Sequence, residues 1–376
     1  MIILTVKAKK VELIELFYDL IFVYAISRLT SIISEHVNGV IAPFSFFAYI
    51  ITSFVILQAW LYFTNYVNRY GQWKWYEYII AVINMIAVIY MANTIGSTWN
   101  YYLQFNISML VMLFTVVILY SVHAYCERSL KGAAGNSITI LLVVCSIYII
   151  SSVAVLWGYM NLVIWLNVLA ILTGAFLPFF IKGKFDKSII NFPHLAERFE
   201  LLTIITFGES VVGMTHFFDV NNFSPLPILV FLIIITMFGS YVLQIHNLIN
   251  HDRVERSLRL MFSHYFIVIS INLVTVALEL INGGEISNWV PAIMLIVSLA
   301  IFYISIMVNK EYYYDDVELT KKDIVLMILV TLVGMSVILI FINSLYGFLI
   351  GALIITLGNF GILLRKYQNF QILIRK

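Results

Sequence analysis

The chain has 376 residues, of which 62% are apolar or aromatic and only 11% are charged. A soluble globular protein averages roughly half apolar and a quarter charged residues, so lipid must be the solvent for most of this chain. The net charge of +2 and the absence of a long basic run exclude a basic nucleic-acid-binding protein. The two cysteines, Cys126 and Cys145, form no disulfide or metal pattern.

Twelve segments are long and apolar enough to cross a bilayer. A membrane-spanning helix needs about 20 mostly apolar residues, and backbone amides in lipid must be satisfied within the chain, which favours helices. The first apolar segment has no small-residue cleavage site and carries Glu15, Asp19 and Arg28, so we expect a retained span and not a signal peptide. The predicted spans cover residues 16–35, 43–64, 76–95, 102–124, 137–157, 160–181, 197–218, 226–248, 261–281, 289–308, 324–343 and 346–364.

Connections that carry Lys or Arg alternate along the chain with connections that carry none. Of the 22 Lys and Arg residues, all except Arg28 lie in the N-terminus, in or beside the even-numbered connections, or in the C-terminal tail. Cytoplasmic loops carry an excess of Lys and Arg, so we predict a multipass cell-membrane protein with both termini in the cytoplasm. The connections without Lys or Arg are residues 35–43, 96–100, 157–161, 218–225, 282–288 and 343–347.

Short motifs recur at a nearly constant spacing and indicate an internal repeat. Residues 15–17 match 197–199 and residues 65–68 match 247–250, both at an offset of 182, while residues 83–84 match 271–272 at 188. Each half then holds six spans, and an even number makes the halves parallel, with a pseudo-two-fold axis along the membrane normal. The predicted fold is all-α: a polytopic transmembrane helical bundle of about 12 spans, built from two parallel six-helix repeats, residues 1–187 and 188–376.

The first span contains charges that are costly in lipid, at about 2.5–3.5 kcal/mol each. Glu15 and Asp19 are four residues apart and therefore share a helix face. Both carboxylates would repel each other if ionised, which favours a proton, a cation or a basic partner between them. The alternative is that both are hydrated at the cytoplasmic interface, and Arg28 could extend its side chain to the outer headgroups.

A partner for Arg28 is suggested by the repeat. Arg28 corresponds to Ser210, whose neighbour Glu209 lies in the seventh predicted span. We therefore predict that Arg28 and Glu209 lie at similar depth and pair where the two halves meet. Arg198 and Glu209 are eleven residues apart, which returns to nearly the same helix face.

Other polar residues favour structural roles. His264 opens the ninth span, where a lone histidine is more often a capped or interfacial group than a proton relay. Asn65 and Asn68, near the end of the second span, and their counterparts Asn247 and Asn250 are expected to bond across helices as structural contacts. No HExxH motif and no nucleotide-binding loop is present, so we expect no metal, no cofactor and no ATP-driven pump.

Three motifs resemble the low-temperature-requirement A (LtrA) family of bacterial membrane proteins. Residues 15–23 read Glu-Leu-Phe-Tyr-Asp-Leu-Ile-Phe-Val, residues 194–199 read His-Leu-Ala-Glu-Arg-Phe followed by Phe-Gly-Glu-Ser at 207–210, and the pair at 264–265 is His-Tyr with Leu-Glu at 278–279. Tyr18 and Phe207 replace the family's usual phenylalanine and leucine. The resemblance covers both halves and implies no particular reaction. It supports the importance of Glu15, Asp19, Glu197, Arg198, Glu209 and His264.

Three functions fit these features. The favoured one is a secondary transporter or permease, with the lipid bilayer and an unknown small molecule or ion as partners and no nucleic acid. The second is a membrane enzyme acting on a lipid or other apolar substrate, in which Glu15, Asp19, Glu197 and His264 would meet in one cleft. The third is a non-catalytic sensor or assembly factor, whose buried charges would all be paired.

Overall fold

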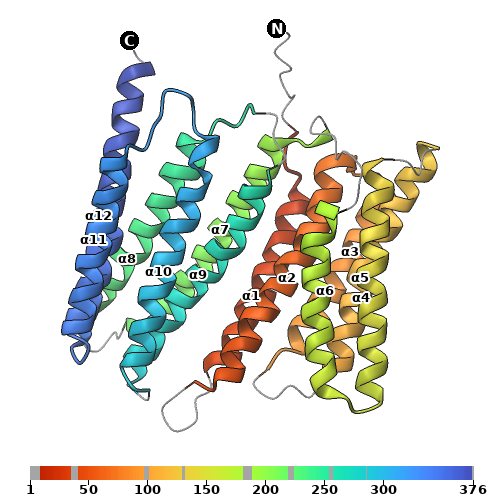
Figure 1. The fold of residues 1–376 in the computed structure, drawn as a ribbon, viewed down its shortest axis with the longest axis horizontal. Helices are drawn as coiled ribbons and strands as arrows, with labels where there is room; N and C mark the ends of the chain where they lie inside the picture. Colours follow the sequence, from red (N-terminus) through yellow and green to blue (C-terminus); the bar gives the residue numbers. More distant parts are fainter. Residues whose placement is uncertain are drawn as a thin grey trace. The chain divides into compact units, whose positions relative to one another are not determined.

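The computed structural model describes residues 9–34, 41–96, 101–128, 132–180, 189–218, 224–253, 257–284 and 286–374. The long apolar runs form helices throughout these ranges, and the only β-structure there is an isolated bridge between Ile249 and Tyr313. The fold is all-helical, as the sequence predicts (Figure 1). The helices are α1 Leu13–Ser34, α2 Pro43–Tyr70, α3 Trp75–Asn93, α4 Tyr102–Cys126, α5 Ala133–Leu156, α6 Met160–Phe180, α7 Phe192–Gly213, α8 Leu226–Tyr241, α9 Leu258–Gly283, α10 Trp289–Val308, α11 Lys321–Ile340 and α12 Leu345–Ile374.

Each predicted span lies on one of these helices. Among the described residues, ten helices are long and apolar enough to cross a membrane, and α8 reaches that length together with η3, a π-helical segment at Val242–Leu248. The other two, α1 and α7, carry several charged side chains along their apolar stretches: Glu15, Asp19 and Arg28 in α1, and Glu197, Arg198, Glu200 and Glu209 in α7. The protein is therefore a multipass membrane protein, and the count of twelve spans stays a prediction.

The chain divides into two compact units. The first unit comprises Met1–Glu35, Pro43–Arg198 and Val254–Arg256, and the second comprises His36–Ala42, Phe199–Arg253 and Ser257–Lys376. Helix α7 contributes its first residues to the first unit and the others to the second. The predicted boundary between residues 187 and 188 lies outside the described residues, so the two-repeat organisation remains a prediction.

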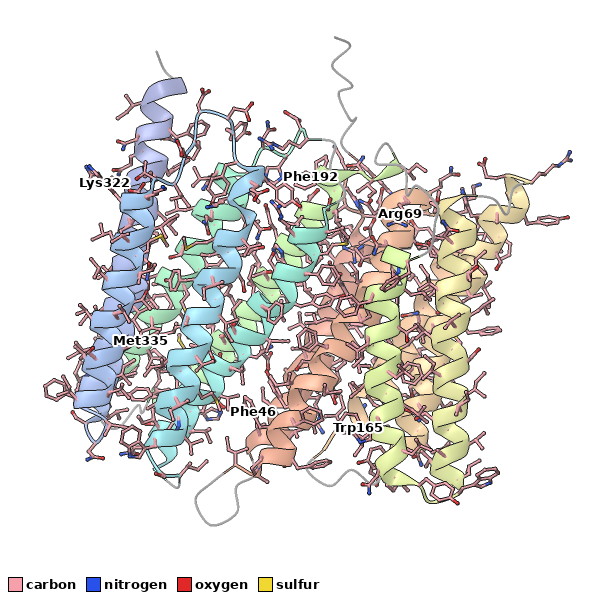
Figure 2. The ribbon with its side chains drawn as sticks, in the orientation of Figure 1. Phe46, Arg69, Trp165, Phe192, Lys322 and Met335 are labelled. Atoms are coloured by element: carbon pink, nitrogen blue, oxygen red, sulfur yellow. The ribbon has the colours of Figure 1, made fainter. Side chains whose placement is uncertain are left out.

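In the first unit, α1 packs on α2 and α3, and each of α3, α4 and α5 packs on the next helix. A buried polar contact fixes these neighbours: Asn84 on α3 accepts a hydrogen bond from Tyr18 on α1 at 2.8 Å and donates to Thr115 on α4 at 2.6 Å. Figure 2 shows Phe46 and Arg69 toward opposite ends of α2. Interhelical hydrogen bonds of this kind hold membrane helices together where lipid gives no hydrophobic drive.

In the second unit, α9 packs on α10, and α12 packs on both α8 and α11. The α11–α12 contact is close because two glycines face each other: a Cβ on Gly334 would lie 2.6 Å from the carbonyl oxygen of Gly351. Small residues commonly allow such approaches between membrane helices. In the first unit α2 also packs on α4 and α6, and in the second α10 also contacts α12.

Candidate functional site

The start of α7 brings two ionisable side chains onto one face. The side-chain oxygen of Asn191 accepts a hydrogen bond from the backbone N–H of His194 at 3.1 Å, as expected of a helix N-cap. Pro193 lies in the first turn, where a missing N–H costs nothing. The helix thus begins five residues before the predicted span, and His194 and Arg198, four residues apart, project from the same face.

The guanidinium of Arg198 joins the two carboxylates of α1. Its Nε and Nη2 donate to Asp19 at 3.0 and 2.5 Å, and its Nη1 donates to Glu15 Oε2 at 2.6 Å. All three side chains are 0% exposed. Planar, bidentate recognition of a carboxylate is a property of arginine that lysine lacks. The basic partner expected between Glu15 and Asp19 is therefore Arg198, and these residues, together with His194, are called the α1–α7 cluster below.

Two tryptophans complete the hydrogen bonding of the cluster. Trp60 on α2 donates to Asp19 Oδ1 at 2.7 Å, and Trp73, just after α2, donates to Glu15 Oε1 at 2.9 Å. The guanidinium carbon of Arg198 lies 5.6 Å from the Trp60 ring centre, within the range of a cation–π contact. Each carboxylate oxygen in the cluster has a donor within reach, so both groups are held as hydrogen-bond acceptors.

The protonation of His194 follows from the amide that faces it. Asn68 donates through Nδ2 to the backbone oxygen of Asn191 at 2.7 Å and accepts from the backbone N–H of Asn191 at 3.2 Å, which fixes the orientation of its amide. The same Nδ2 lies 3.1 Å from His194 Nδ1. Because Nδ2 is a donor, this contact suits the tautomer of His194 in which Nδ1 accepts and Nε2 carries the proton.

That proton faces the carboxylates. Nε2 of His194 lies 3.1 Å from Glu15 Oε2, at an ion-pair distance but without hydrogen-bond alignment. With His194 in that form, two carboxylates oppose one guanidinium and the four side chains of the cluster sum to −1, while the Lys9 ammonium acts on Glu15 from outside the cluster. An excess charge in a fully buried site is costly. Uptake of one cation or proton would neutralise it.

The other predicted charged residues lie apart from these contacts. Arg28 is exposed on α1 in the first unit, and Glu209 is half-buried on α7 in the second. Their pairing remains a prediction. Glu197 precedes Arg198 but has an exposed side chain, because a step of one residue along a helix turns the side chain by about 100°.

His264 is a buried histidine with both ring nitrogens engaged. Its Nδ1 lies 2.7 Å from the backbone oxygen of Leu260, and its Nε2 lies 3.0 Å from the hydroxyl of Tyr241. A carbonyl only accepts, so Nδ1 carries the proton and Nε2 accepts from Tyr241. The Phe199 ring packs at 4.6 Å on the same imidazole. This environment suits the structural role of His264 better than a proton relay.

The four asparagines predicted to bond across helices, Asn65, Asn68, Asn247 and Asn250, differ in their contacts. Asn68 bonds across helices to the start of α7, as described above, while Asn65 is half-buried. Asn247 bonds within its own segment, to the backbone oxygen of Val242. The Asn250 side chain accepts from the backbone N–H of Asp252 in a turn. Those two lie at or beyond the π-helical end of α8, where side chains bond the local backbone instead of a neighbouring helix.

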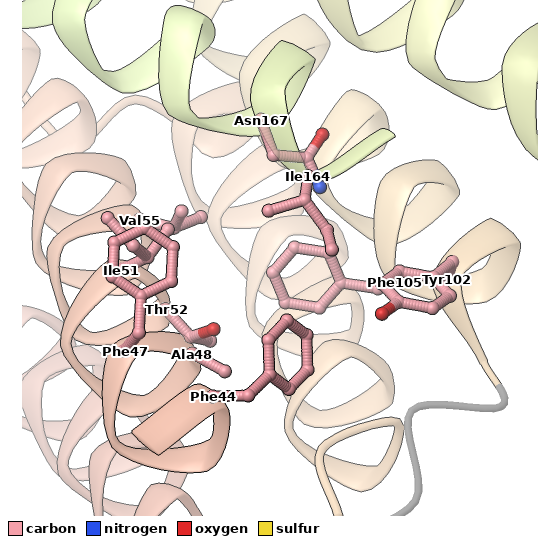
Figure 3. A pocket seen from close by; sticks show the side chains of 10 residues that line it. All are labelled: Phe44, Phe47, Ala48, Ile51, Thr52, Val55, Tyr102, Phe105, Ile164 and Asn167. Carbon is pink, nitrogen blue, oxygen red and sulfur yellow. The ribbon is translucent and has the colours of Figure 1, made fainter. Parts of the chain in front are cut away.

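Two pockets of the first unit lie at different positions along its helices. One, of about 40 Å³, is lined mostly by aromatic and aliphatic side chains of α2, α4 and α6, with Thr52 and Asn167 as its polar members (Figure 3). The other, of about 300 Å³, is lined by Asn68 and Asn191, the two residues that orient His194, together with basic side chains. Of the two, only the larger has charged side chains in its lining.

Residue types alone did not reveal the partners of the cluster. Trp60, Trp73 and the linking role of Asn68 come from the packing of α2 against α1 and α7, and short-range sequence patterns carry no signal for them. The short-range sequence feature that indicates the cluster is the i,i+4 spacing of His194 and Arg198 after an Asn-Phe-Pro helix start. Across the part of the chain that the structure describes, no three His, Cys, Asp or Glu side chains are arranged to hold a metal ion.

Comparison with known proteins agrees with the motifs. No curated protein matches the chain significantly. A family model described as "Bacterial low temperature requirement A protein (LtrA)" matches residues 10–358, nearly the whole chain, and confirms the predicted resemblance. The matched range contains both carboxylates of α1 and the whole of α7. The chain belongs to the LtrA family of bacterial membrane proteins.

Proposed function

We propose that this protein is a secondary transporter of the cell membrane, with both termini in the cytoplasm, and that the α1–α7 cluster binds its coupling proton. The observation that carries the proposal is the excess negative charge of the cluster, two carboxylates against one guanidinium, at 0% exposure. Ionisable groups inside membrane proteins commonly mark ion or proton pathways.

A proton fits this site better than a metal cation. Every oxygen of Glu15 and Asp19 already accepts a hydrogen bond or lies against a ring N–H, which leaves no free oxygen cage for a hard cation. A proton on Glu15 would remove one of the two charges that hold Arg198. The ion pairing that holds the start of α7 to α1 would then weaken. Helix α7 continues into the second unit.

Uptake by proteoliposomes tests the proposal. The purified full-length protein is reconstituted, an extract of ¹³C-labelled bacterial metabolites is added outside, and a pH gradient is imposed. Compounds that accumulate are identified by mass spectrometry. Gradient-dependent accumulation of at least one compound is expected with the wild type and with Asp252→Asn, an exposed control carboxylate. Glu15→Gln should lose it. Failure of the folded wild type to accumulate any compound would refute transport.

A second function is favoured by the completeness of the pairing. Because each buried charge of the cluster has partners, the cluster also suits a non-catalytic sensor or assembly factor in which it only fixes α7 to α1. In that case Glu15→Gln changes stability and no compound moves. A lipid-modifying enzyme is less well supported, because Glu15 and Asp19 are fully buried and both nitrogens of His264 are engaged.

A further inference from the structure

The larger pocket of the first unit, of about 300 Å³, reaches the α1–α7 cluster from the helix ends. It is lined by the end of α2, by His123 near the end of α4 and by residues 189–191 just before α7. Gln72, one of its lining residues, is exposed, so the pocket opens to the surface there. One water takes up about 30 Å³ of liquid, and a polar pocket of this size therefore admits solvent as far as Asn68.

Two side chains separate this pocket from Glu15. Asn68 lines the pocket, and its Nδ2 lies 3.1 Å from Nδ1 of His194. The other ring nitrogen of His194, Nε2, lies 3.1 Å from Glu15 Oε2. Proton transfer needs donor and acceptor atoms about 2.6–3.2 Å apart, and their alignment often improves only while the site is at work. The buried imidazole thus spans the distance between the Asn68 amide and the carboxylate.

Among the described residues, His194 is the one contact of Glu15 that can both take up and release a proton near neutral pH. The other contacts are the indole N–H of Trp73 at 2.9 Å, the guanidinium of Arg198 at 2.6 Å and the backbone N–H of Glu12 at 3.4 Å. Indole and amide groups only donate, and a guanidinium is not deprotonated in proteins. Imidazole, in contrast, changes its charge between about pH 5 and 8.

We propose that His194 carries the coupling proton between the pocket and Glu15. This inference rests on the proposed proton-coupled transport and names the residue that supplies its proton. A hydronium ion in the pocket gives a proton to Nδ1 and becomes water. The resulting imidazolium releases its Nε2 proton to Glu15 Oε2, which leaves a neutral ring protonated on Nδ1 and an uncharged Glu15. The reverse sequence returns the proton to the pocket.

Asn68 controls the entry of this proton as a positioning residue. Its amide is held by two hydrogen bonds with the backbone of Asn191, at 2.7 and 3.2 Å, with Nδ2 toward the ring of His194. A proton on Nδ1 would face that donor, so uptake requires the amide to rotate and present Oδ1 instead. The rotation breaks both contacts with Asn191. The resting amide therefore opposes protonation of the ring until Asn68 turns.

Two measurements on proteoliposomes of the full-length protein test this path. The first is uptake of the ¹³C-labelled metabolite extract, driven by a pH gradient. The second is exchange, in which vesicles loaded with unlabelled extract take up label without a gradient, so that no net proton has to reach or leave Glu15. Folded His194→Gln should show uptake about tenfold or more slower than the wild type and should retain exchange. His246→Gln, which changes an exposed histidine of the second unit, should match the wild type in both.

The outcomes separate the relay from the transporter. Loss of both uptake and exchange in folded His194→Gln would assign His194 a structural role, and wild-type rates of both would mean that Glu15 receives its proton by another path. Either result overturns the relay while the transporter stands. A wild type that moves no compound refutes transport, and the relay with it.

Nitrogen NMR of ¹⁵N-histidine-labelled protein tests the entry path without any transport. Asn68→Asp presents a carboxylate to Nδ1 in place of a donor, so His194 should be doubly protonated at pH 7, in contrast to the wild type. A singly protonated ring in this variant would overturn the entry through Nδ1. Should His194→Gln fail to fold, this result decides the outcome.

Discussion

Arg198 and Asp19 are 179 residues apart in the sequence, yet their side chains form a two-pronged ion pair at 3.0 and 2.5 Å inside the first unit. The pair ties the start of α7 to α1 with no solvent exposure on either side. Because Glu15 bonds to the same guanidinium, removal of that group leaves two buried carboxylates without their arginine partner.

Arg198→Met should therefore be strongly destabilising. Removing one partner of a buried ion pair costs about 3–5 kcal/mol. The free energy of unfolding of Arg198→Lys should lie between those of wild type and Arg198→Met, because lysine keeps the charge but not the paired geometry. Denaturant unfolding of the purified protein measures the change. The matched control is Arg259→Met, which breaks a half-exposed pair with Glu311 and should cost only about 0–1 kcal/mol. Equal stability of Arg198→Met and wild type would contradict the assigned network.

His194 should be neutral at pH 7 with its proton on Nε2. The amide of Asn68 donates to Nδ1, so a proton there would place two donors face to face. Nitrogen NMR of selectively ¹⁵N-histidine-labelled protein reports the state of each ring nitrogen. One protonated and one unprotonated nitrogen is expected for His194, identified by its loss in His194→Gln. A doubly protonated ring would make the cluster neutral and would contradict its proposed excess negative charge.

Gly334→Ala should separate α11 from α12. The added Cβ would lie 2.6 Å from the backbone oxygen of Gly351, and overpacking of this kind costs about 1–3 kcal/mol. Gly361→Ala is the control in α12, because no atom lies within 4 Å of its added Cβ. There the higher helix propensity of alanine should leave stability unchanged or raise it by about 0.5–1 kcal/mol. Thermal unfolding of both variants checks the difference in sign.

The helices were predictable because their cause is local. Apolar runs of about 20 residues give the positions of all twelve, and only the ends shift. The predicted span begins at residue 197, whereas α7 begins at Phe192. The ionisable His194 in this first turn is compensated by Asn68 and Glu15, which come from other helices. Hydropathy cannot register a compensation that comes from another helix.

The site was predictable only in part, for the same reason. The carboxylate pair of α1 and its need for a basic partner follow from helix geometry. Which base supplies it depends on how α7 packs on α1, and Trp60 and Trp73 become donors only through that packing. Lys9 is similar: the N-terminal lysines suggest orientation alone, and its hydrogen bonds to the backbone oxygens of Val67 and Gly71 depend on how the N-terminal segment packs against the end of α2.

The central claim is that the buried excess charge carries the coupling proton. Its most direct test is the internal pH of proteoliposomes, followed with an entrapped dye, while a compound identified in the metabolite uptake experiment moves inward. The account predicts that internal acidification accompanies uptake in the wild type and in Asp252→Asn and that both are absent in folded Glu15→Gln. Uptake and acidification at the wild-type rate in Glu15→Gln would contradict it.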